Sequence, residues 1–143
     1  MTRKSRQDAI NEYIRTDPFA NYLGATFDVI EPGFSRVSLQ VTEEMVNFHG
    51  ITHGSVVFAL GDMAFAAAGN SHGQIALAMN VSISFLRASK PGDYLIAEAK
   101  EQHAGGRTAL YDITVVDQKS GKLVAKSQNL VYRKREWFVP PEA

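Results

Sequence analysis

The chain has 143 residues, and its 15 lysines and arginines are balanced by 15 aspartates and glutamates. This length fits one domain with a sizeable core, and the neutral balance argues against a nucleic-acid partner. Because the chain lacks cysteine, disulfides, thiolate metal sites and cysteine nucleophiles are excluded, as expected for a cytoplasmic protein. Residues 1–15 are charged and the longest apolar run, residues 56–68, is interrupted, so we expect neither a signal peptide nor a membrane partner.

The first third of the sequence predicts a helical segment followed by a hairpin. Apolar residues recur at helical spacing over residues 5–16, and Pro18 ends that helix because the residue before a proline avoids the helical region. A further turn or short helix follows. Two strands, residues 27–30 and 36–41, then flank a turn at 31–34, where proline and glycine are placed for a type II turn.

The rest of the chain predicts one long helix and four more strands. The helix runs from Gly54 to about Asn70 and is rich in glycine and alanine, which allow a sheet to approach closely. The four strands, separated by glycine-containing turns, cover residues 75–86, 94–102, 108–117 and 123–133. This order of elements favours an α+β fold in which a curved antiparallel sheet surrounds one central helix.

We expect residues 1–143 to form a single domain. The N-terminal helix at 5–16 precedes a core over about 19–133, and residues 134–143 form a C-terminal tail. The tail contains apolar residues without any periodicity, so we expect it to pack on a neighbour or to stay loose.

The loop from Asn47 to Ser55 and the helix after it carry the strongest functional signal. At Gly54 the helix begins, and its unpaired backbone N–H groups and dipole can stabilise a carbonyl oxygen that gains negative charge. Asp62 is the one acid in the apolar part of this helix. A carboxylate there is costly unless it has partners or a catalytic role. The combination predicts an acyl-transfer site.

The spacing between Gly54 and Asp62 predicts a site shared by two chains. Eight residues of helix place them ~12 Å apart, which is too far for both to contact one carbonyl group. If both serve one reaction, they come from different chains of a dimer. A two-fold axis then creates two equivalent composite sites.

Each of these residues also has a purely structural interpretation. Asp62 can be a helix aspartate that bonds to a nearby amide or hydroxyl group. Gly54 can simply begin the helix, with Thr52 or a neighbouring serine as its cap. His53 and Asn47 can set the shape of the loop through hydrogen bonds, which we favour over acid/base catalysis by His53.

Three other patterns suggest different chemistry and are weaker. The sequence Gly69-Asn70-Ser71-His72-Gly73 matches a nucleophile elbow, but the order of helix and strand around it is reversed, so we reject a serine hydrolase. Two histidines four residues apart, His49 and His53, suit a metal site poorly because a glycine separates them and Asp62 lies far beyond. The Gly105-Gly106-Arg107 turn either holds a phosphate or simply closes a hairpin.

Taken together, these elements resemble a known family, the hotdog-fold acyl-CoA thioesterases of the PaaI type. The resemblance extends from about residue 19 to residue 132. The residues that carry it are Asn47, Gly50, His53-Gly54-Ser55, Asp62, Phe85-Leu86-Arg87, Gly92-Asp93 and Tyr111-Asp112-Ile113.

The resemblance implies a dimer with sites at its interface, commonly arranged as a tetramer, without metal or cofactor. It implies that the Gly54 N–H polarises the thioester carbonyl and that Asp62 of the other subunit acts as general base or as nucleophile. Asn47 and His53 would position the substrate or the leaving thiolate. Ser55 replaces a second glycine of the family pattern, and we expect its side chain to affect the substrate range.

The substrate implied by the resemblance is phenylacetyl-CoA or a related aryl thioester. The side chains of Arg87, Lys90 and Arg107 are candidates to bind coenzyme A phosphates, with solvated surface charge as the alternative. Two other functions remain open. In a hydratase or dehydratase of the same fold, His53 and Asp62 would form an acid/base pair, and in an acyl-CoA sensor the pocket would bind without turnover.

Overall fold

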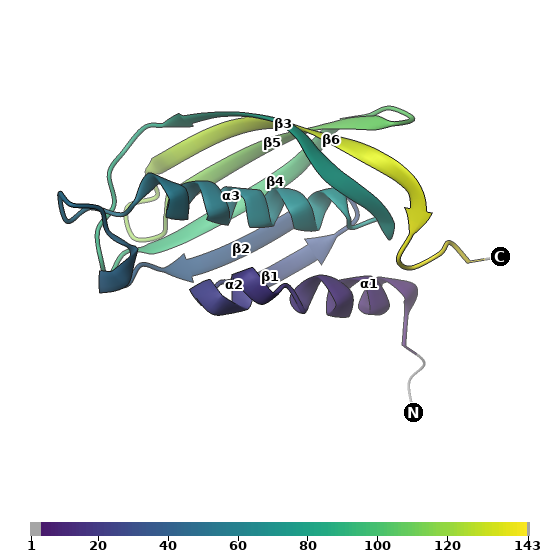
Figure 1. Cartoon of the computed structure of the whole chain (residues 1–143), viewed down its shortest axis with the longest axis horizontal. Helices are drawn as coiled ribbons and strands as arrows, with labels where there is room; N and C mark the ends of the chain where they lie inside the picture. The colour runs from purple at the N-terminus through teal and green to yellow at the C-terminus, as the bar shows by residue number, and fades with distance from the viewer. Residues whose placement is uncertain (1–3, 143) are drawn as a thin grey trace.

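A curved six-stranded sheet encloses one long helix in the computed structural model, which describes residues 4–142 (Figure 1). Residues 1–3 and 143, which the predicted domain includes, lie outside this range. The helices are α1 (Arg6–Arg15), α2 (Pro18–Leu23) and α3 (Gly54–Gly69), with a 3₁₀ turn, η1, at Glu43–Met45. The strands are β1 (Thr26–Glu31), β2 (Phe34–Gln40), β3 (Gln74–Phe85), β4 (Tyr94–Ala104), β5 (Thr108–Asp117) and β6 (Leu123–Trp137).

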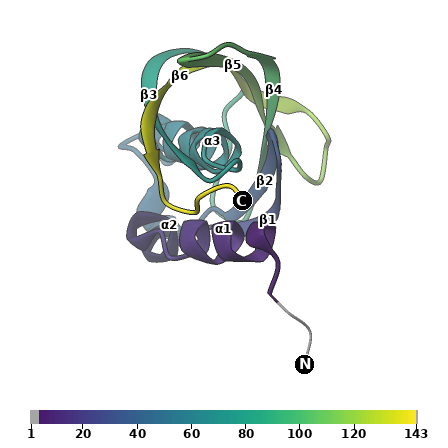
Figure 2. The same cartoon turned by 90° about the vertical axis from the view of Figure 1, so that its right-hand side faces the viewer.

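The strands pair antiparallel in the order β1-β2-β4-β5-β6-β3, so β1 and β3 are the edges. Viewed along α3, the sheet curls around the helix as an arch, and α1 and α2 lie across its open side between the two edge strands (Figure 2). The fold is therefore the predicted α+β arrangement. The turn predicted at 31–34 joins β1 to β2, with Gly33 at φ 76°.

Small residues on α3 allow the sheet to approach the helix closely. A Cβ atom on Gly61 would lie 3.6 Å from a methyl carbon of Ile113 and 3.7 Å from one of Val115. Further along the helix, the ring of Phe65 meets the ring of Tyr111 edge-on, with centroids 5.7 Å apart. The side chains packed here are at most 1% exposed: Ile113, Val115, Phe65 and Tyr111. The core thus lies between α3 and the concave face of the sheet.

The C-terminal segment packs on neighbouring elements of the chain, which is the first of the two predicted alternatives for the tail. Strand β6 continues four residues beyond the predicted end at Arg133, because Trp137 still pairs with Gln74 of β3. The ring of Phe138 then stacks on that of Tyr13 in α1, with centroids 4.7 Å apart. Arg6 donates a hydrogen bond to the carbonyl of Val139 at 2.8 Å.

Among the helices of residues 4–142, none is long and apolar enough to cross a membrane.

Candidate active site

The loop before α3 is held at both ends by hydrogen bonds. Val46 and Thr52 form an isolated antiparallel bridge, and the N–H of His53 donates to the carbonyl of Met45 at 2.8 Å. On the other side, the N–H of Thr52 donates to the carbonyl of Ser89 at 2.9 Å, and the Ser89 hydroxyl donates to the Thr52 hydroxyl at 2.6 Å. The start of α3 is therefore fixed relative to the connection between β3 and β4.

Asn47 shapes this loop through its side-chain oxygen. Its Oδ1 accepts a hydrogen bond from the N–H of His49 at 2.9 Å, and its carbonyl accepts one from the N–H of Gly50 at 3.0 Å. Gly50 has φ 78°, a conformation that a side chain disfavours. Asn47 thus has the loop-setting role that the sequence allowed, while its amide nitrogen remains available to a ligand.

His53 is the N-cap of α3, in place of the Thr52 or Ser55 cap that the structural interpretation of Gly54 offered. Its Nδ1 accepts a hydrogen bond from the N–H of Ser55 at 3.0 Å and lies 2.7 Å from the Ser55 hydroxyl. Because Nδ1 accepts from a backbone N–H, the ring proton of the neutral imidazole lies on Nε2. Nδ1 is therefore engaged, and the exposed Nε2 is left as a donor.

The backbone N–H of Gly54 lies at the start of α3 and faces a cavity. No acceptor within residues 4–142 hydrogen-bonds to this N–H. It borders a cavity of about 350 Å³ whose lining includes Asn47, Phe85 and Arg87. A Cβ on Gly54 would lie 3.7 Å from the ring of Phe85, so this aromatic side chain forms the wall opposite the helix start.

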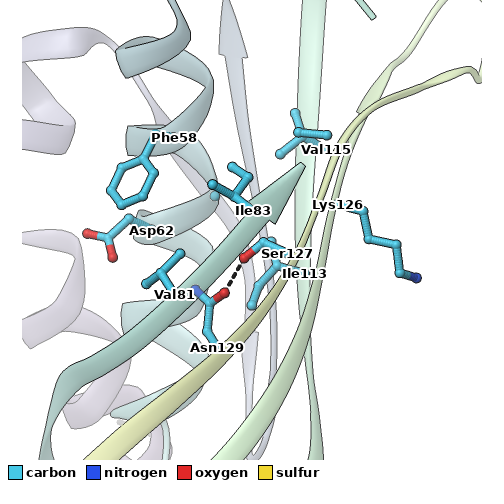
Figure 3. A pocket seen from close by; sticks show the side chains of 11 residues that line it. Phe58, Asp62, Val81, Ile83, Ile113, Val115, Lys126, Ser127 and Asn129 are labelled. Carbon is cyan, nitrogen blue, oxygen red and sulfur yellow. Dashed lines mark hydrogen bonds between the residues drawn. The ribbon is translucent and has the colours of Figure 1, made fainter. Parts of the chain in front are cut away.

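Asp62 lies half-buried on α3 without a hydrogen-bond donor among residues 4–142. Burial raises its pKa above the ordinary value of 3.8, and the negative charge of Asp17 raises it further. Figure 3 shows its carboxylate pointing away from the side chains of the sheet. The structural interpretation, a carboxylate bonded to a nearby amide or hydroxyl, therefore has no support within residues 4–142.

A pair of buried polar side chains near Asp62 was missed by the sequence analysis. Ser127 and Asn129 hydrogen-bond to each other and share a narrow cleft with Asp62 (Figure 3). Both are inward-facing residues of β6, at alternate positions between Ala125 and Val131. The sequence signal that could have revealed them is the presence of polar residues at inward positions of an otherwise apolar strand.

The basic residues predicted to bind phosphate are not all brought together within one chain. Arg87 lines the cavity next to Gly54, and both Arg87 and Lys90 line a second cavity beside it. Arg107 lies in the turn between β4 and β5, at the opposite end of β4. The 11 residues of β4 span roughly 33 Å.

The structure also bears on two of the weaker sequence patterns, the nucleophile elbow at Ser71 and the metal site. The hydroxyl of Ser71 is buried, donates to the carbonyl of Ala68 at 2.6 Å and accepts from the N–H of Gly33 at 2.8 Å. It therefore joins the end of α3 to the β1–β2 turn. Among residues 4–142, no three histidine, aspartate or glutamate side chains cluster as metal ligands would.

Gly54 and Asp62 lie on the same helix, α3, so the ~12 Å separation expected from helix geometry applies to the structure. One end of the helix offers an unpaired N–H, and its middle offers a carboxylate of raised pKa. Within a single chain, these two groups cannot act on the same carbonyl carbon.

Comparisons with known proteins identify the family. The profile of the thioesterase superfamily matches residues 49–124. The Escherichia coli K12 acyl-coenzyme A thioesterase PaaI is 40% identical over 119 residues, which are 83% of this chain and 84% of that protein.

Similar solved structures support the same family. The E. coli PaaI protein from the phenylacetic acid degradation operon superposes with a TM-score of 0.88 and 34% identity over 95% of this chain and 99% of that one. A Streptococcus mutans UA159 protein bound to acetyl-CoA superposes with a TM-score of 0.73 and 28% identity over 77% and 88% of the two chains. The chain therefore belongs to the thioesterase superfamily and is a hotdog-fold thioester hydrolase of the PaaI type.

Proposed function

We propose that this enzyme hydrolyses phenylacetyl-CoA or related aryl-CoA thioesters to the free acid and coenzyme A, at sites shared by two chains. The observation that carries the proposal is the pair formed by Gly54 and Asp62. Among the described residues 4–142, the Gly54 N–H has no acceptor and the half-buried Asp62 carboxylate has no donor, and the two lie ~12 Å apart on one helix. A second copy of the chain supplies the missing partner for each.

In the proposed general-base route, the Asp62 carboxylate removes a proton from water as the water oxygen attacks the thioester carbon. The Gly54 N–H of the other subunit donates a hydrogen bond to the oxyanion that forms. When the C–S bond breaks, the electron pair leaves with the sulfur, and protonated Asp62 returns the proton to the thiolate. The products are a carboxylic acid and free coenzyme A.

In the nucleophilic route, the Asp62 carboxylate attacks the same carbon and expels the thiolate. Water then hydrolyses the resulting anhydride and regenerates the carboxylate. The raised pKa of Asp62 favours the general-base route, because a more basic carboxylate is a better proton acceptor at neutral pH. Both routes use the same two residues.

The dimer is supported by the edge strand β3. This strand exposes large apolar side chains, with Leu77 53% exposed, Met79 60% and Phe85 54%. An unpaired strand edge of this kind favours pairing with another strand. Pairing of β3 with β3 of a second copy would bring two α3 helices together across a two-fold axis. We further propose that two such dimers form a tetramer.

The remaining residues of the site are proposed to bind and position the substrate. Asn47 and the Nε2 of His53 would donate hydrogen bonds to the thioester or to the leaving thiolate. Ser55 would narrow the entrance at the helix start. Arg87 and Lys90 would bind coenzyme A phosphates, while Arg107 would do so only from another chain of the assembly.

The aryl substrate is supported by the relatives. The E. coli protein with 34% identity over nearly the whole chain comes from the phenylacetic acid degradation operon. We also propose that residues 1–143 form one domain and that the enzyme acts in the cytoplasm, which the absence of cysteine favours.

The test is release of free thiol from phenylacetyl-CoA by the wild type and by Asp62→Asn, at matched fold and oligomeric state. We expect the variant to lose ~100-fold or more of the activity, as for removal of a catalytic base. Equal rates would exclude Asp62 from the reaction.

Two further outcomes point to the alternative functions. Addition of water to a 2-enoyl thioester without thiol release would indicate a hydratase. Tight binding of acyl-CoA without turnover would indicate a sensor.

A further inference from the structure

Another cavity, of about 410 Å³ and separate from the two near Gly54, lies between the α1–α2 segment, α3 and the start of β3. We call it the elbow cavity. Its volume is within the range of small-molecule pockets. Its lining is mainly apolar and includes Tyr13, Phe27, Met63, Ala66, Leu77 and Phe138.

The polar side chains of the elbow cavity are already engaged by the backbone. Asn70 bonds to the backbone of Ala66 and Ala76, and the hydroxyl of Thr16 donates to the carbonyl of Tyr13. Oδ1 of Asp17 accepts the N–H groups of the first turn of α2. The described residues that line the cavity include no lysine, arginine or histidine. Such a pocket recognises an uncharged apolar group.

The elbow cavity adjoins Asp62. Met63, the next residue along α3, and Ala66, one helical turn further, both line it. Asp17 also lines it, and the charge of Asp17 acts on Asp62. The elbow cavity therefore begins within one helical turn of Asp62, while Asp62 itself lines the narrow cleft with Ser127 and Asn129.

Resting on the proposed function, we propose that the elbow cavity holds the acyl group of the thioester, so that the α1–α2 segment sets acyl selectivity. The thioester then lies beside Asp62, and its acyl chain extends past Met63 toward the stacked rings of Tyr13 and Phe138. Both rings line the cavity. In this arrangement their distance from Asp62 limits the length of the acyl group.

Ala66 offers a direct test, because it is an exposed helical residue facing the cavity. We expect Ala66→Leu to fill the pocket and to lower kcat/KM for phenylacetyl-CoA relative to acetyl-CoA by about tenfold or more. The matched control is Ala104→Leu, an exposed residue at the end of β4, for which we expect the wild-type ratio. Sedimentation verifies the oligomeric state of each protein.

A second variant tests the far wall. Phe138→Ala removes one ring of the stack, and we expect it to raise kcat/KM for longer acyl groups relative to phenylacetyl-CoA. An unchanged ratio in both variants would overturn the assignment of the cavity. So would dissociation of the Ala66→Leu oligomer, because it would show that a second copy fills the cavity. Lack of wild-type turnover on every acyl-CoA would instead refute the proposed function itself.

Discussion

At the scale of single residues, the structure separates groups that stabilise the fold from groups that only a reaction explains. Ser71 has two hydrogen-bond partners within the chain, and His53 caps a helix. Asp62 has no hydrogen-bond donor in the described part of the chain, and its pKa is raised, which means that its charged form is disfavoured by folding. A carboxylate in such surroundings reduces stability and is typical of a functional site.

This reasoning predicts that Asp62→Asn stabilises the protein at neutral pH. Since the folded-state pKa lies above the unfolded value, the folded state binds more protons between the two values, and unfolding becomes easier as pH rises through them. We expect the variant to have a higher Tm than the wild type at pH 7. The difference should shrink as the pH falls below 3.8, where Asp62 is protonated in both states. A lower Tm for the variant at pH 7 would contradict the view that the charged Asp62 side chain destabilises the fold.

Gly54 allows the oxyanion role to be separated from side-chain effects. Proline is tolerated at the first helical position, and His53 before it has ψ 135°, which suits a residue preceding proline. Gly54→Pro removes the N–H, and we expect kcat to fall by about 10² to 10³. Gly54→Ala keeps the N–H and places its Cβ at an ordinary contact distance from Phe85, so it is the control. Equal kcat values in the two variants would rule out a catalytic role for the Gly54 N–H.

At the scale of elements, one acid joins several strands to the end of α3. Glu101 of β4 accepts hydrogen bonds from the Tyr111 hydroxyl of β5 at 2.8 Å and from Arg133 of β6 at 2.9 Å. It also lies 3.1 Å from the ring of His72, just after α3. Burial alone would raise the pKa of Glu101, but the hydrogen bonds and positive neighbours outweigh it and lower the pKa below 4.5.

We expect Glu101→Gln to reduce the free energy of unfolding by about 1 to 3 kcal/mol at neutral pH, the usual effect of breaking partly buried hydrogen bonds. Because the folded-state pKa is lowered, the wild type loses its advantage as the pH falls through that value. Urea unfolding at pH 7 and at lower pH measures both effects. The exposed Glu136→Gln is the control, and a loss of the same size there would contradict a special role for Glu101.

The elements themselves were largely predictable from local patterns. The strand at 108–117 was predicted with the bounds that the structure has, and the long helix differs by one residue at its end. The extension of β6 to Trp137 was not predictable, because it depends on pairing with distant Gln74. The cap of α3 was missed because histidine is not among the usual N-cap residues.

At the scale of the whole molecule, the order of the strands leaves an open sheet edge at which a second chain can complete the site. Strand β3 follows α3 in the sequence, yet it pairs with β6 and forms an open edge. Sequence periodicity indicates that a strand exists but not its neighbour, so this order was not predictable. The sequence did predict the central helix and the ~12 Å separation along it. From these two facts follows the central claim that each site needs two chains.

A mixed dimer tests this claim most directly. One subunit carries Asp62→Asn and the other Gly54→Pro, each with a different affinity tag. Dimers are first separated from tetramers by size, so that two affinity purifications then retain only the mixed dimer. If each site combines Gly54 of one chain with Asp62 of the other, one site is intact and the second carries both changes. We predict about half of the wild-type rate of thiol release per dimer, although each variant alone is nearly inactive. A mixed dimer as inactive as the two parent variants would contradict the shared site.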